Sequence, residues 1–150
     1  MIRRSHLLVL VSLIAGSATA VIGCGETAYP QGQAIYAYKC SNCHMDDGSG
    51  LVGNIPPLAQ ADWLEKHRDE IACVIRYGQQ GEVIVNGLTY SGVMQGFPEL
   101  SDTELTNLAN YVLTSWGNDQ PPLKPTEIPE MLSRCELDKP IKLGNPQKLR

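Results

Sequence analysis

Five consecutive residues, Cys40-Ser41-Asn42-Cys43-His44, constrain this chain of 150 residues more than any other feature. C-x-x-C-H is the attachment motif of a c-type haem. The two thiols reach the two vinyl groups of one porphyrin, and the adjacent histidine supplies an imidazole nitrogen to the iron. The motif occurs only once. The sequence therefore predicts a single covalently bound haem c with His44 as one axial ligand.

The same letters also occur in zinc sites and in thiol-redox sites. A zinc site needs further Cys or His ligands nearby, but the next histidine is His67 and the next cysteine is Cys73. A thioredoxin-like motif needs a βαβ setting, and no such pattern surrounds the motif. We therefore favour haem attachment over both alternatives.

The first 23 residues are typical of an export signal. Arg3 and Arg4 form a positive start, and an apolar run from Leu7 to Ala15 is followed by small residues. The run is too short to span a bilayer. A twin-arginine signal is an alternative to an ordinary basic start. We expect an exported, periplasmic protein, because c-type haem is attached after export.

Cys24 lies at one of two candidate cleavage positions. Residues 18–20 form an A-x-A site, whereas residues 21–24 resemble a bacterial lipobox in which Cys24 becomes the acylated first residue. We favour lipidation, which would anchor the protein at a membrane surface. The alternative is a spare thiol, or one that is removed by ordinary cleavage.

Two cysteines remain, Cys73 and Cys135. An exported chain can keep a disulfide, and a bridge between them would tie the C-terminal tail to the body of the domain. Two buried thiols are the alternative. Loss of Arg3 and Arg4 with the signal takes the formal net charge from −4 to −6. An acidic protein without basic clusters is not expected to bind nucleic acid.

Helical spacing and turn signals predict a mostly α-helical domain over residues 31–118. A tether over residues 24–30 precedes it, and a Pro-rich extension over residues 119–150 follows it. We expect helices over residues 31–39, from Asp62 to about Tyr77, and after a capping box at Ser101–Glu104. A further short helix is expected around residues 127–134.

The segments between these helices carry turn signals. Residues 46–57 are rich in Gly, Asp and Pro and are expected to form a loop. Asn86-Gly87 stands between two β-prone runs and predicts a hairpin over residues 82–90. Asp62 with Glu65 resembles a second capping box. Gly78 and Gly117 are the residue type that follows helix ends.

Residues 31 to about 118 resemble the class I, monohaem cytochromes c of small bacterial type. Three stretches carry the resemblance: G-x-x-I-Y from Gly32 into the C-x-x-C-H motif, Pro56-Pro57-Leu58, and Met94 in a loop before the last helix. The resemblance implies a fold of about four helices around one haem, with the hairpin as a small insert. It also implies that Gly32, Tyr36, Leu108 and Tyr111 form the crossing of the first and last helices.

The resemblance further implies the ligands of the iron. The carbonyl of Pro56 would accept the ring N–H of His44, and the Met94 sulfur would bind the iron on the opposite side. A lone Met is usually a gap-filler in a core. However, Met45 directly follows His44 and cannot reach the opposite side, and Met131 lies in the Pro-rich tail. Cys73 as a thiolate ligand is a minor alternative.

The implied function is transfer of single electrons from a donor to an acceptor redox protein, with no catalytic residues. A His and a Met on the iron leave no open position for a substrate. The alternatives are a subunit of a larger oxidoreductase, docked through residues 119–150, and a haem enzyme or sensor with a labile sixth ligand. Trp63, Tyr90 and Trp116 are candidates to donate to haem propionates, although simple packing is the preferred interpretation. We expect His67 to be a solvated surface residue.

Overall fold

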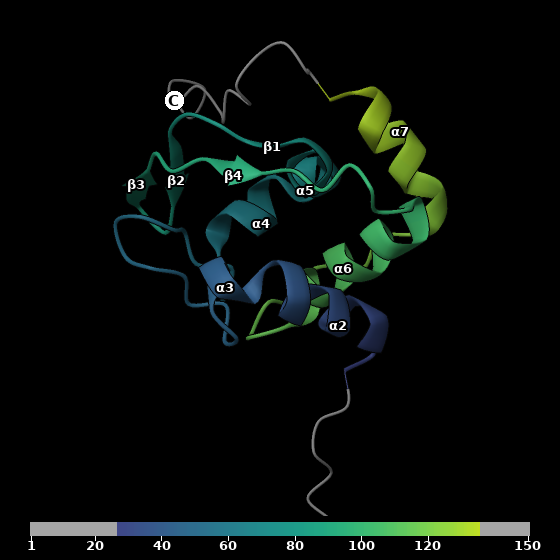
Figure 1. Cartoon of the computed structure of the whole chain (residues 1–150), viewed down its shortest axis with the longest axis horizontal. Helices are drawn as coiled ribbons and strands as arrows, with labels where there is room; N and C mark the ends of the chain where they lie inside the picture. The colour runs from purple at the N-terminus through teal and green to yellow at the C-terminus, as the bar shows by residue number, and fades with distance from the viewer. Residues whose placement is uncertain (1–26, 136–150) are drawn as a thin grey trace, which may run out of the picture.

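The structure is a computed structural model that describes residues 27–135. The expected signal over residues 1–23 and the expected lipidation of Cys24 lie outside these residues. None of the described helices is both long and apolar enough to cross a bilayer. Within residues 27–135 the helices follow one another as α2, α3, α4, α5, α6 and α7 (Figure 1), and this part of the chain also contains two short 3-10 helices and four short strands.

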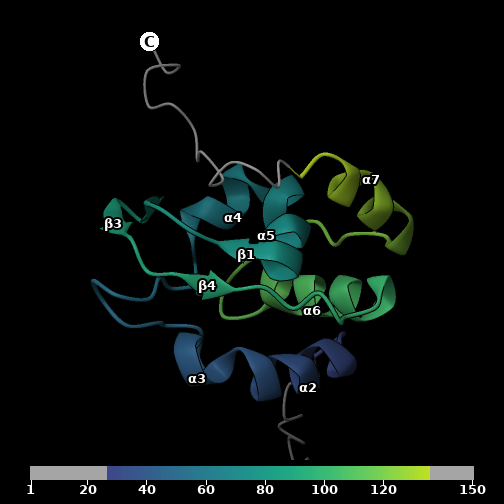
Figure 2. The ribbon, with the colours of Figure 1, turned by 45° about the horizontal axis from the view of Figure 1, so that its top comes forward.

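The crossing of α2 (Pro30–Lys39) with α6 (Asp102–Thr114) is the centre of the fold. Gly32 and Tyr36 are the buried residues of α2, and they face Leu108 and Tyr111 within the core cluster. A Cβ atom on Gly32 would overlap the main-chain carbonyl of Asn107 on α6. Glycine is therefore required for the two backbones to approach so closely. Figure 2 shows α2 and α3 (Ser41–His44) as one layer beside α6.

The capping box of α6 forms as predicted: the Ser101 hydroxyl accepts from the N–H of Glu104, whose carboxylate accepts from the N–H of Ser101. The far end of α6 differs from the prediction. The helix ends at Thr114, and its C-cap is Ser115 in an extended conformation, so Gly117 is not its cap. Instead, Trp116 and Gly117 both have positive φ and reverse the chain after the helix.

The helix expected from Asp62 to Tyr77 is broken into three pieces: α4 (Asp62–Lys66), a 3-10 turn (Arg68–Glu70) and α5 (Ile71–Tyr77). The break lies at His67, whose φ of −129° and ψ of 32° are not helical. Gly78 follows α5, as predicted.

The expected capping box at Asp62 is also wrong, because the N-cap is Ala61 and has no side-chain cap. Asp62 and Asn86 instead exchange two hydrogen bonds. The Asp62 carboxylate accepts from the N–H of Asn86 at 2.6 Å, and the Asn86 side-chain oxygen accepts from the N–H of Asp62 at 2.9 Å. These bonds attach the start of α4 to the turn of the hairpin.

The strands form two antiparallel pairs. The predicted hairpin is present, with β2 (Val83–Val85) paired to β3 (Leu88–Tyr90) across Asn86-Gly87, both of which have positive φ. The second pair was not predicted. It joins β1 (Gly78–Gln79), directly after α5, to β4 (Met94–Gln95). This pairing fixes the segment that carries Met94 against the end of α5.

Residues 119–135 pack onto the helical core and contribute side chains to it. Leu123, Ile128 and Met131 are buried in the same apolar cluster as α5 and α6, and α7 (Ile128–Ser133) lies against α5. The buried Asn110 side chain on α6 donates to the Leu123 carbonyl at 2.9 Å and accepts from the Leu123 N–H at 2.6 Å. Arg68 donates to the carbonyls of two prolines in the same segment at 2.7 and 3.0 Å.

A disulfide joins Cys73 on α5 to Cys135, with the two sulfur atoms 1.99 Å apart. The bond closes a loop of 62 residues. Because Cys73 is bonded in this way, it is not available as a thiolate ligand of an iron.

Cys135→Ser is expected to lower the free energy of unfolding by about 2–4 kcal/mol, because the unfolded chain regains the freedom that a long closed loop removes. Urea unfolding of the haem-loaded protein, with Ser133→Ala on the exposed side of α7 as a control, measures the difference. A loss no greater than that of the control would show that the bridge does not contribute to stability.

Candidate haem site

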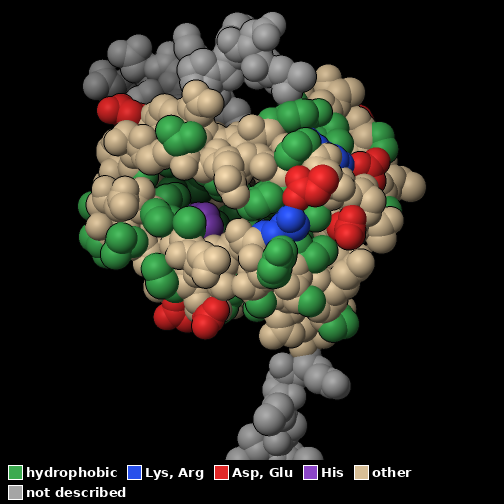
Figure 3. Space-filling model, in the orientation of Figure 1, with side chains coloured by type: hydrophobic (Ala, Val, Ile, Leu, Met, Phe, Trp, Pro, Cys, Tyr) green, Lys and Arg blue, Asp and Glu red, His purple; other side chains and the backbone are tan. Residues whose placement is uncertain are grey.

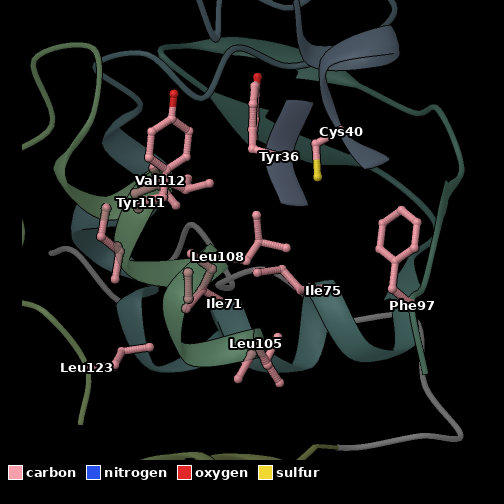
Figure 4. Packing of buried hydrophobic residues seen from close by; sticks show 14 of the residues in the cluster. Tyr36, Cys40, Ile71, Ile75, Phe97, Leu105, Leu108, Tyr111, Val112 and Leu123 are labelled. Carbon is pink, nitrogen blue, oxygen red and sulfur yellow. The ribbon is translucent and has the colours of Figure 1, made fainter. Parts of the chain in front are cut away.

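The C-x-x-C-H motif lies where α2 passes into α3. Cys40 is the C-cap of α2, and α3 is a single turn that ends at His44. Cys40 and Cys43 are both free thiols, with Cys40 buried and Cys43 exposed. Figure 4 shows the Cys40 sulfur directed into the apolar interior, toward Ile75 and Phe97. The turn therefore presents one thiol to the interior and one to the surface, and it does not bond them to each other.

His44 is buried, with 7% of its surface exposed. Its Nδ1 donates to the Pro56 carbonyl at 3.0 Å. Burial lowers the pKa of the imidazole, and the bond to Pro56 offsets this only in part. The ring is therefore neutral near pH 7 and has its proton on Nδ1. Nε2 then has no proton, and its lone pair can bind a metal.

The loop after His44 delivers Pro56 to this position. The His44 carbonyl accepts from the N–H of Gly50 at 3.1 Å, and Leu51 and Ile55 form an isolated antiparallel bridge. Gly50 has a φ of 63°, and a Cβ atom there would lie 2.6 Å from the Pro56 carbonyl oxygen. Because residue 50 is a glycine, the chain can turn there and can also pass close to the Pro56 carbonyl oxygen, which accepts the hydrogen bond from His44.

Gly50→Ala is expected to displace the Pro56 carbonyl from His44. A methyl group at this position meets main-chain atoms and adopts a φ that L residues rarely occupy, so stability falls by about 1–3 kcal/mol. The weakened hydrogen bond makes the imidazole a poorer donor, and we expect a higher reduction potential. Redox titration and thermal unfolding measure both effects.

Gly53→Ala is the matched control for this variant. Its φ of 78° is also positive, but a Cβ atom there would meet nothing within 4 Å. The control includes the cost of the backbone conformation without the contact. Equal potentials in the two variants would contradict a role for the Gly50 contact in holding Pro56.

Met94 lies on β4, opposite Gln79 of β1. Its side chain is half-buried and packs against the core cluster. A Cβ atom on Gly78 would overlap the Met94 carbonyl oxygen, and one on Gly96 would lie 2.6 Å from the Arg76 carbonyl oxygen. Two glycines thus let the Met94 segment pass directly over the end of α5.

Two cationic side chains hold the segment that follows Met94. Arg76 donates to the carbonyls of Pro98 and Leu100 and pairs with Asp102 at 2.8 Å. Lys39, next to the motif, pairs with Glu99 at 2.5 Å. These contacts connect the Met94 loop to α6 on one side and to the end of α2 on the other.

Aromatic side chains fix the beginning of the loop after His44. The Tyr36 hydroxyl donates to the Met45 carbonyl at 2.6 Å, and Trp116 Nε1 donates to the Asp46 carbonyl at 3.1 Å. Burial raises the pKa of the Tyr36 hydroxyl far above its usual value. Tyr36, Tyr111 and Trp116 also contact one another, with ring centroids 4.7–5.5 Å apart.

The three candidate propionate donors have different surroundings. Trp116 Nε1 is already bonded to Asp46, and Trp63 Nε1 is buried without a hydrogen-bond partner. Tyr90 is buried in the core cluster. His67 stacks on Trp63, and its Nδ1 lies 3.1 Å from a Glu70 carboxylate oxygen. His67 is thus in contact with two neighbours on its own segment, Trp63 and Glu70, and it is only partly exposed.

These residues fit a haem c. The motif offers two separate thiols, a buried neutral imidazole with Nε2 unbonded, and a soft thioether on a fixed loop. Figure 3 shows a hollow on this face with hydrophobic side chains at its sides, backbone or polar uncharged atoms above and below it, and a histidine inside it. Among residues 27–135, no group of three or more His, Cys, Asp or Glu is placed to hold a metal ion.

The family model for cytochrome c matches residues 30–116. This chain belongs to the cytochrome c family. The match confirms the resemblance to the monohaem cytochromes c and the mostly helical fold, and it assigns the chain a covalently bound haem c.

The similar proteins are bacterial. A cytochrome c-552 of Thermus thermophilus is 40% identical over 95 residues, which cover 61% of this chain and 64% of that protein. The cytochrome c subunit of the quinone alcohol dehydrogenase of Gluconobacter oxydans is 32% identical over 109 residues, 71% of this chain but only 22% of the subunit. The CcoP subunit of the cbb3-type oxidase of Rhodobacter capsulatus is 30% identical over 96 residues, 31% of its length.

Proposed function

We propose that this protein carries single electrons on one haem c whose iron is bound by His44 and Met94. The observation that supports this most directly is the hydrogen bond from His44 Nδ1 to the Pro56 carbonyl. It holds the ring as the neutral tautomer with Nε2 available. Met94 is proposed as the second ligand because its loop is fixed by the β1–β4 pair.

When bound, the haem supplies an iron that alternates between ferrous and ferric states. Cys40 and Cys43 would hold the porphyrin by thioether bonds and so prevent its loss. Pro56 keeps the imidazole of His44 oriented and raises its donor strength. The Met94 sulfur is a soft ligand that favours the ferrous state. The buried side chains of Phe97 and Ile75 lie on the side to which the Cys40 sulfur points and would keep water from the haem there.

Oxidised and reduced spectra with a redox titration test this proposal. We expect the absorption bands of a low-spin c-type haem, one reversible one-electron step, and a weak near-infrared band of Met–iron ligation in the ferric protein. The reduced protein should not bind carbon monoxide without denaturation. Carbon monoxide binding to the native protein would instead favour a haem enzyme or sensor with a labile sixth ligand.

A role as the cytochrome subunit of a larger oxidoreductase is the second candidate. The similarity to subunits of alcohol dehydrogenases and an oxidase favours it. Purification from native membranes in mild detergent distinguishes the two. A free carrier elutes alone, whereas a subunit elutes with a stoichiometric partner.

We also propose that the protein is exported and anchored through Cys24. The basic start, the apolar run and the lipobox-like residues 21–24 support this placement. Mass spectrometry of the mature N-terminus tests it, because a lipoprotein begins at Cys24 with acyl chains attached. An unmodified chain that begins at Val21 would contradict anchoring.

A further inference from the structure

One buried polar side chain, that of Gln79, is not fully hydrogen-bonded. The buried polar residues among residues 27–135 are His44, Gln79, Thr106 and Asn110. The Asn110 amide, for comparison, is bonded at both ends to the Leu123 backbone. Of these four residues, Gln79 alone has a buried side-chain atom, Oε1, without a hydrogen-bond partner in the described part of the chain. This oxygen therefore needs an explanation other than a role in the hydrogen bonding of the fold.

The orientation of the Gln79 amide follows from its nitrogen. Nε2 donates to the Gln80 carbonyl at 3.2 Å. A flipped amide would place Oε1 against that carbonyl, and two acceptors repel each other, so the nitrogen belongs at this position. The oxygen is the negative end of the amide dipole. It is therefore the negative end that lies in the interior without a partner.

Gln79 lies beside the proposed iron ligand Met94. The two residues are directly opposite each other in the antiparallel pair of β1 and β4, which Figure 2 shows side by side. Side chains of opposite residues extend to the same face of the pair, with Cβ atoms about 4.5–5.5 Å apart. Gln79 is 8% exposed, and Met94 packs against the core cluster. Both side chains therefore extend toward the interior from the two-residue pairing that fixes the Met94 loop.

The surroundings of Gln79 favour an electrostatic role over packing. Residues 83–98, which include Met94, contain no Asp, Glu, Lys, Arg or His. Arg76, on α5, is bonded to Asp102 and to two carbonyls. An apolar side chain would fill the same space without leaving a buried acceptor unpaired. A partial charge in such a site acts on its neighbours with little screening.

We propose that Gln79 lowers the reduction potential of the haem by holding a buried amide oxygen on the side of the iron that Met94 binds. The inference rests on the proposed ligation by Met94 and deepens it. Ferric haem has one more positive charge than ferrous haem, so a nearby partial negative charge stabilises the ferric state. The Met94 sulfur favours the ferrous state. The two opposite residues thus shift the potential in opposite directions.

Redox titration of Gln79→Leu and Gln79→Asn tests this proposal. Leucine and asparagine have the same branched shape, so the pair separates the amide from the space that it fills. We expect Gln79→Leu to shift the redox equilibrium about three- to tenfold toward the ferrous protein, which is a rise of about 30–60 mV in the potential. Gln79→Asn keeps an amide on the same face of β1 and should give a clearly smaller rise.

Gln80→Leu is the matched control. Gln80 is the next residue, has the same amide group and is exposed. Its replacement should leave the potential unchanged. Urea unfolding of the haem-loaded variants gives a second readout. Gln79→Leu should unfold at the same urea concentration as the wild-type protein or at a higher one, because it removes an unpaired acceptor from the interior.

A lower potential in Gln79→Leu would overturn the proposal, because it would indicate that the amide nitrogen donates to the Met94 sulfur instead. Equal potentials in the Leu and Asn variants would also overturn it. So would a shifted potential in Gln80→Leu. A Gln79→Leu protein that unfolds at a lower urea concentration than Gln80→Leu would assign Gln79 a structural role.

The near-infrared band of Met–iron ligation distinguishes failure of this inference from failure of the proposed function. Absence of the band from the wild-type protein would reject Met94 as a ligand, and the role of Gln79 with it. Presence of the band together with an unchanged potential in Gln79→Leu would reject the role of Gln79 alone. Loss of the band in Gln79→Leu would also reject that role, because the shift would then come from a change of ligand.

Discussion

Met94→Ala is expected to lower the reduction potential by on the order of 0.2 V, a fraction of the ~0.8 V range that axial ligands control. A thioether sulfur stabilises ferrous iron more than ferric iron, so its removal favours the oxidised form. The variant should also lose the near-infrared band of Met–iron ligation. Its reduced form should bind carbon monoxide, because one axial position becomes open.

Met45→Ala is the matched control for this prediction. Met45 directly follows His44 and is 36% exposed, so it is close to the motif in the chain but is not proposed as a ligand. It should keep the potential, the near-infrared band and the resistance to carbon monoxide. A Met94→Ala protein that retained the band would show that another side chain binds the iron.

Gly32→Ala is expected to be strongly destabilising. The added methyl group overlaps the Asn107 carbonyl oxygen and lies 2.8 Å from the Tyr111 Cβ atom. Main-chain atoms of a buried helix cannot move aside as a flexible side chain can. The two helices must separate, and the loss should be about 3 kcal/mol.

Guanidinium chloride unfolding of the haem-loaded protein measures this loss. Gln33→Ala, on the exposed side of the same helix, is the control and should be neutral or slightly stabilising because alanine is the better helix former. A Gly32→Ala protein as stable as the control would mean that α2 and α6 do not approach as closely as the structure describes.

Local patterns predicted the elements whose signal is long or chemically specific. The capping box at Ser101–Glu104 began α6 where expected, and Asn86-Gly87 formed the expected hairpin turn. The break at His67 was not predicted because residues on both sides keep a helical pattern. It is associated with a tertiary contact, the hydrogen bonds from Arg68 to the carbonyls of residues 121 and 122.

In the candidate site, too, some features were predicted from local sequence patterns and others depend on tertiary contacts. The C-x-x-C-H motif and the Pro56 position follow from sequence, and the His44–Pro56 contact is present in the structure. The β1–β4 pair under Met94 has two residues in each strand, which is too short to show an alternating pattern. Gly50 was part of an expected loop, but its role depends on a contact with residues five and six positions later.

The two hydrogen bonds between the Asn110 side chain and the Leu123 backbone matter for the design of fusion proteins that contain this domain. Residues 119–135 complete the core, so a fragment that stops at residue 118 would expose the apolar surfaces of α5 and α6 that Leu123, Ile128 and Met131 cover. A portable unit must therefore include the segment of residues 119–135. A fusion protein built around this haem should therefore join its next module after Cys135.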